Sequence, residues 1–137
     1  MGEGEVKGAW LNDLRKYISD ISSVIPLEAI ILYGSASRNL NGAWSDIDIL
    51  VVSDAFKGMP IPDRIGLLLR FKRGRIEALG YTYDELARMV NAVNPLALNA
   101  LVEGKIIVGS DRVRRLAEEA KKQFTRRGRA WFRVNAG

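Results

Sequence analysis

Two aspartates and a Gly-Ser pair are the residues of this chain whose types and spacing point to chemistry. Gly34 and Ser35 follow one apolar run, and Asp46 and Asp48 stand at the head of a second, with ten residues between the two pairs. Carboxylates two apart on a strand share a face and repel each other, and Mg²⁺ is an ion that takes such groups together with phosphate oxygens. Gly34 allows a close backbone approach, and a helix starting near Ser35 would direct free N–H groups at a phosphate. The stretch predicts a phosphate-binding turn beside a metal site.

The elements that must position these residues are two short strands. Ala29 to Tyr33 and Ile47 to Val52 are rich in β-branched residues and bounded by turn residues, which favours buried strands. Taken separately, a Gly-Ser turn or an Asp-x-Asp at a strand start is more often structural than catalytic. Their combination in this order is much more specific, and we interpret it as functional.

The pattern Gly-Ser-x10-Asp-x-Asp, with Ser45 before the first aspartate, resembles the nucleotidyltransferase signature of the DNA polymerase β superfamily. It is most similar to the small stand-alone members, the minimal nucleotidyltransferases of archaea and bacteria. The resemblance implies that Gly34 and Ser35 hold the nucleotide phosphates. It also implies that Asp46 and Asp48 bind the metal ions.

Two further positions of the same stretch enter through the resemblance. Arg38 matches an arginine often found just after the Gly-Ser pair, and together with Ser45 it is expected to help bind the nucleotide. Asn39 stands where the family often has glycine, a mild departure because asparagine tolerates a left-handed backbone. The resemblance covers roughly residues 10–110, although only this first motif is sharply specific.

A third carboxylate is expected from the next strand, Arg75 to Tyr81, which carries Glu77. In the resembling family a carboxylate on such a strand completes a catalytic and metal-binding triad with the first two. Glu77 is the matching position, although the family often has aspartate there. Whether Glu77 takes a proton or only binds metal stays open. The alternative is an exposed strand glutamate.

The composition bounds the fold and the chemistry. The 137 residues suit a single domain, with 47% apolar and 27% charged residues, as in ordinary globular proteins. The chain has no cysteine and no histidine, which excludes disulfides, thiolate zinc sites and proton transfer by imidazole. No apolar run approaches the length of a membrane span and no signal peptide is visible, so we expect a cytoplasmic protein without membrane contact.

The fold class expected is α/β (α+β), with a small mixed sheet and helices mainly on one face. Apolar spacing predicts a first helix over Ala9 to Ile21, preceded by a frayed start at residues 1–8. Start signals predict three later helices, through a Thr82-x-x-Glu85 capping box, Asn94-Pro95 and Ser110. The helix that Ser110 starts is the last one and is expected over Asp111 to Arg126. The remaining predictions are a helix over Asp63 to Arg70 and a strand over Lys105 to Val108.

The C-terminal segment, residues 111–137, is strongly basic. It holds nine basic and three acidic residues, a net charge of +6, whereas the rest of the chain carries −1. Its end alternates arginines with Trp131 and Phe132, a pattern that can bind nucleic acid through phosphates and stacking, or dock on an acidic protein. Equally, the two aromatic side chains can fold back on the domain.

The reaction implied is transfer of a nucleoside monophosphate, AMP from ATP, to an acceptor hydroxyl, with two Mg²⁺ ions and release of pyrophosphate. The resemblance further implies a toxin–antitoxin role beside a separate HEPN-type protein. Transfer to a small molecule is disfavoured because no substrate domain is visible. A different class stays open, a non-catalytic module that senses nucleotide or binds RNA or protein through the basic segment. The acceptor, the base of the nucleotide and a homo-oligomeric state are not fixed by the sequence.

Overall fold

The sheet at the centre of the molecule has four strands in the order β3-β2-β1-β4. The computed structural model describes residues 3–34 and 46–134. β1 (Ala29–Tyr33) pairs antiparallel with β2 (Ile47–Val52) and with β4 (Lys105–Gly109), whereas β2 pairs parallel with β3 (Ile76–Tyr81). The mixed sheet confirms the expected fold class, and β1 and β2 have the bounds that the sequence predicted.

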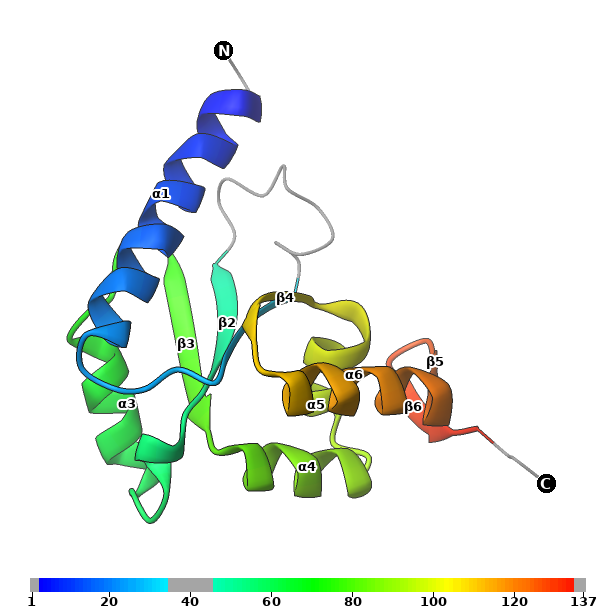
Figure 1. The fold of residues 1–137 in the computed structure, drawn as a ribbon. Coiled ribbons are helices and arrows are strands. Elements are labelled where there is room, and N and C mark those ends of the chain that lie inside the picture. Colours follow the sequence, from blue (N-terminus) through cyan, green and yellow to red (C-terminus); the bar gives the residue numbers. More distant parts are fainter. Residues whose placement is uncertain (1–2, 35–45, 135–137) are drawn as a thin grey trace.

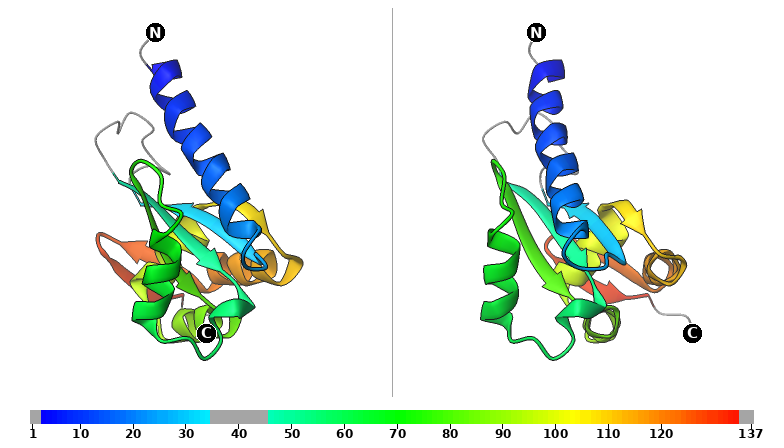
Figure 2. Two further views of the ribbon diagram at one scale, coloured as in Figure 1. Left: turned by 90° about the vertical axis from the view of Figure 1, so that its left-hand side faces the viewer. Right: turned by 60° about the vertical axis from the view of Figure 1, so that its left-hand side comes forward.

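Both faces of this sheet are covered by helices (Figures 1 and 2). One face packs against α1 (Glu3–Ser22) and α3 (Ile61–Leu69). The other packs against α4 (Tyr83–Asn91), α5 (Pro95–Leu98) with a following π-helical turn, and α6 (Asp111–Gln123). The sequence predicted helices mainly on one face, and more of them do lie on the side of α4, α5 and α6, but α1 and α3 cover the other face as well. Ala29–Leu32 of β1 and Ile49–Val52 of β2 are apolar and at most 2% exposed, so each of these strands needs a cover on both sides.

The first helix is longer than its apolar pattern suggests. It begins at Glu3, whereas the prediction started it at Ala9 and left residues 1–8 outside it. Tyr17 lies in the core between α1 and the sheet, 1% exposed, and its hydroxyl donates to the carbonyl of Leu68 at 2.9 Å. Tyr17 is therefore a packing residue that joins α1 to the end of α3.

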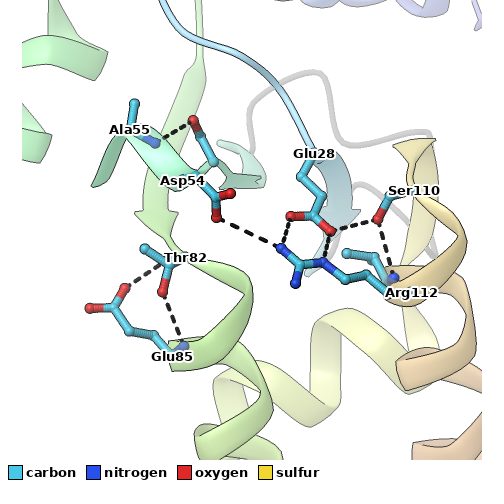
Figure 3. Close-up of polar contacts among 9 residues, drawn as sticks. Glu28, Asp54, Ala55, Thr82, Glu85, Ser110 and Arg112 are labelled. Atoms are coloured by element: carbon cyan, nitrogen blue, oxygen red, sulfur yellow. Dashed lines mark hydrogen bonds and ion pairs between the residues drawn. The ribbon is translucent and has the colours of Figure 1, made fainter. Parts of the chain in front are cut away.

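The predicted start signals all form. Thr82 and Glu85 make the reciprocal capping box of α4, Asn94 accepts from two backbone N–H groups of α5, and the Ser110 hydroxyl caps α6. Ser110 also donates to Glu28 at 2.7 Å, and the Arg112 guanidinium binds the same carboxylate (Figure 3). The Arg112 hydrogen bonds are the main reason that the pKa of Glu28 lies below its ordinary value. This cluster fixes the start of α6 against β1.

The C-terminal segment differs most from expectation. The last helix stops at Gln123, and the chain then forms a two-stranded hairpin, β5 (Phe124–Arg127) and β6 (Ala130–Arg133). Gly128 opens the two-residue turn with φ +62°, a value suited to the tight turns of hairpins. Among the residues described, no helix has the length and apolar character needed to cross a membrane.

Candidate functional site

Three neighbouring strands bring candidate site residues to one end of the sheet. Tyr33, the last residue of β1, is the register partner of Asp48 near the start of β2, and Asp48 is in turn the register partner of Glu77 on β3. Partners in register lie side by side on one face of a sheet. The structure thus brings Tyr33, Asp48 and Glu77 together.

The electrostatics at Asp48 are dominated by burial and negative charge. Asp48 is partly buried, and Asp46 is exposed just before β2. Burial, followed by the charges of Asp46 and Glu77, raises the pKa of Asp48 above its ordinary value. Burial and the Asp48 charge also raise the pKa of Tyr33 to about 12, so its hydroxyl stays neutral at physiological pH. A cation at this place would relieve the repulsion among the carboxylates.

Gly34 lies against the Asp48 carboxylate. Its φ is +78°, and a Cβ on it would lie 2.8 Å from Oδ2 of Asp48. Any side chain here would therefore strain the backbone and displace the carboxylate. The glycine keeps the chain tight against one of the expected metal ligands.

Glu77 has a partner that the sequence did not reveal. Nζ of Lys72 lies 2.6 Å from its Oε1, and both side chains are substantially exposed, 36% for Lys72 and 46% for Glu77. Lys72 belongs to the basic turn Lys72-Arg73-Gly74-Arg75, and the positive charge of that turn just before β3 is a sequence signal that could have found it. The next residue, Arg73, instead pairs with Asp20 of α1 at 2.8 Å.

The donor chemistry of the site fits Mg²⁺, because all three expected ligands are carboxylates. Within the described residues, no three acidic side chains are gathered in a way that could hold a metal ion. Oε1 of Glu77 is paired with Lys72, so this lysine would compete with a cation shared by Asp46, Asp48 and Glu77 for the Glu77 carboxylate. Ser35, Arg38 and Ser45, expected to bind nucleotide, lie outside the described residues.

Comparisons with known proteins identify a family and a fold. A family model described as a nucleotidyltransferase domain matches residues 11–122. A crystal structure from Sulfolobus solfataricus, of a protein described as a candidate nucleotidyltransferase, is similar with a TM-score of 0.57 and 29% identity over 64% of this chain and 80% of that one. The crystal structure of a toxin–antitoxin with AMP-PNP has a TM-score of 0.51 and 20% identity over 81% of this chain and 83% of that one, which shows a likeness of fold. No curated protein matches the sequence.

Proposed function

The chain belongs to the nucleotidyltransferase domain family, and from that premise we propose that it transfers AMP from ATP to a hydroxyl of a partner protein. The observation that carries the proposal is the pairing of Asp48 with Glu77 across β2 and β3, beside Gly34 and next to Asp46. Three carboxylates and a close backbone turn at one end of the sheet suit a nucleoside triphosphate and its cations.

Each residue has a distinct role in the proposed reaction. Gly34 and Ser35 hold the β- and γ-phosphates, and Arg38 and Ser45 help to orient the nucleotide. Asp46, Asp48 and Glu77 would hold two Mg²⁺ ions, which supply charge neutralisation at the phosphates and lower the pKa of the acceptor hydroxyl. The family motif is the basis for the roles of the five residues that lie outside β2 and β3, namely Gly34, Ser35, Arg38, Ser45 and Asp46.

The bonding changes are those of an in-line displacement at the α-phosphorus. The acceptor oxygen forms a bond to that phosphorus, the bond from the α-phosphorus to the oxygen bridging to the β-phosphate breaks, and pyrophosphate leaves. The acceptor proton passes to Glu77 or to water, since the chain offers no histidine. Exposed Glu77 is open to solvent, which suits release of that proton.

A separate partner polypeptide is the proposed acceptor. The toxin–antitoxin neighbour and the resemblance to minimal nucleotidyltransferases support a toxin–antitoxin role with an HEPN-type protein. We place this chain on the antitoxin side, as the protein that modifies its partner.

The test is transfer of label from α-labelled ATP with Mg²⁺ in a lysate of the source cells. We expect label on one protein band, reduced by at least about 100-fold in Asp46→Asn/Asp48→Asn, because loss of residues that only orient metal ligands already costs up to about 100-fold. Glu119→Gln, an exposed acid on α6, is the control and should transfer normally. Unchanged transfer in the double variant would refute the site. Bound ATP without transfer in any sample would favour the nucleotide-sensing module instead.

A further inference from the structure

The C-terminal hairpin forms a separate small sheet that the proposed reaction does not use. β5 and β6 pair antiparallel and pack beside α5 and α6, away from α1 and α3 (Figure 1). Trp131 is its inward anchor, 8% exposed, and donates from Nε1 to Oδ1 of Asn99 at 2.8 Å. The hairpin is therefore a fixed part of the domain with one face left outside.

The hairpin carries positive charge that no acidic residue of its own offsets. Residues 124–134 contain four arginines and no acidic residue. Two of these point to the domain, because Arg126 pairs with Glu103 at 2.8 Å and Arg133 donates to the carbonyl of Asn91 at 3.1 Å. Arg127 and Arg129 are exposed and form no ion pair within residues 3–34 and 46–134. Positive charge is thus concentrated on the outer face and the turn.

An aromatic ring lies on that outer face. Successive residues of a strand point to opposite faces, so Phe132 points outward where Trp131 points inward, and Phe132 is 47% exposed. The Arg127 guanidinium lies 5.8 Å from the Phe132 ring centroid, and Thr125 is the cross-strand partner of Phe132. A flat ring, a cation over it and an exposed hydroxyl therefore share one surface.

We propose that this outer face binds single-stranded RNA. A base stacks on Phe132, Arg127 and Arg129 contact the flanking phosphates, and the Thr125 hydroxyl faces the ribose, where the 2′-hydroxyl distinguishes RNA from DNA. An acidic peptide would use the arginines but would leave the exposed ring without a matching group. The combination of ring and cations favours a nucleic acid with unpaired bases.

The test measures fluorescence anisotropy of a labelled single-stranded RNA of about 12 nucleotides, a length within the range of small single-strand sites. The full chain is used without ATP or Mg²⁺, so the result is independent of nucleotide transfer. Phe132→Ala should weaken binding about tenfold through the lost base stack. Arg127→Glu/Arg129→Glu should weaken binding more, and should flatten the slope of log affinity against log salt by about 1.4.

The matched control is Arg15→Glu/Lys16→Glu, which makes the same charge change at exposed positions of α1 on the other side of the sheet. It should bind RNA nearly as wild type. Equal losses in the control and in the hairpin variant would overturn the proposal, because net charge alone would then explain binding. Equal binding of DNA, or displacement of RNA by polyglutamate at matched charge concentration, would overturn the assignment to RNA.

Discussion

Asp48 and Glu77 are register partners on the parallel strands β2 and β3, but their carboxylates have different surroundings. Asp48 is partly buried and close to like charges, which raise its pKa, whereas Glu77 forms an ion pair with Lys72 at 2.6 Å. Lys72 therefore occupies the carboxylate that would complete the proposed metal site. Lysine and metal ion compete for one group.

The first prediction follows from that competition. Lys72→Met should lower the Mg²⁺ concentration that gives half-maximal nucleotide transfer by up to about fivefold, because an exposed ion pair is worth at most ~1 kcal/mol. The measurement is a Mg²⁺ titration of transfer. Lys57→Met, at an exposed loop lysine, should leave the titration unchanged. A higher half-maximal Mg²⁺ concentration in Lys72→Met would instead assign the lysine to the phosphates. An unchanged concentration would remove Glu77 from the metal site.

The second prediction compares two glycines with nearly the same backbone. Gly34 has φ +78° and Gly58 has φ +74°, but only a Cβ at Gly34 would meet another atom, Oδ2 of Asp48 at 2.8 Å. Alanine at either site should cost roughly 1–2 kcal/mol of unfolding free energy for its left-handed backbone. Only Gly34→Ala should also reduce transfer, by displacing Asp48. Urea unfolding and the transfer assay check the two effects separately. Equal transfer in both variants would show that the absence of a side chain at Gly34 does not determine the position of the Asp48 carboxylate.

Local sequence signals were sufficient for the elements that build the site. The runs that became β1 and β2 are mostly apolar, with Asp48 the one charged residue in them, and both are bounded by turn residues, so their limits could be read directly. The capping box at Thr82 and Glu85 was recognised because its pattern lies within four residues. Such signals depend on neighbours in the chain.

Long-range pairing could not be predicted in the same way. Arg64 and Glu85 are 21 residues apart in the chain but form two hydrogen bonds in the fold, of 2.6 and 2.9 Å. The hairpin was missed because β5 lacks apolar alternation and its first residues continue the helical pattern of α6. Its formation depends on Trp131 reaching Asn99, a contact 32 residues apart. The exposure of Glu77 and its pairing with Lys72 likewise depend on the fold and could not be predicted from the sequence.

The third prediction concerns the Arg64–Glu85 pair. The Arg64 side chain is 5% exposed and that of Glu85 is 28% exposed. The Arg64 hydrogen bonds lower the pKa of Glu85 to about 2. Glu85→Gln leaves a buried guanidinium without a charge partner, so we expect a loss of about 3 kcal/mol in unfolding free energy. The same change at Glu118, whose pair with Lys121 at 3.6 Å is exposed, should cost less than about 0.5 kcal/mol.

The fourth prediction is the pH dependence of the same pair. Because the folded pKa of Glu85 is lower than the ordinary 4.5, its contribution to stability is complete above about pH 4.5 and is lost as pH falls toward 2. Urea unfolding of wild type should weaken across that window. Glu85→Gln should show a shallower decline, since the titrating group is gone. Parallel pH curves for the two proteins would show that Glu85 does not titrate abnormally.

The fifth prediction separates two adjacent aromatic residues. Trp131→Phe keeps a ring in the core but removes the hydrogen bond to Asn99, and the unpaired amide should cost about 1–2 kcal/mol of unfolding free energy. Phe132→Leu changes an outer side chain, 47% exposed, and should stay within about 0.5 kcal/mol of wild type. Thermal unfolding measures both. In a double-mutant cycle, Asn99→Ala should add little to Trp131→Phe, because both changes remove one bond. Fully additive losses would mean that the Trp131–Asn99 bond does not hold the hairpin to the domain, and the RNA-binding face would then lose its rigid support.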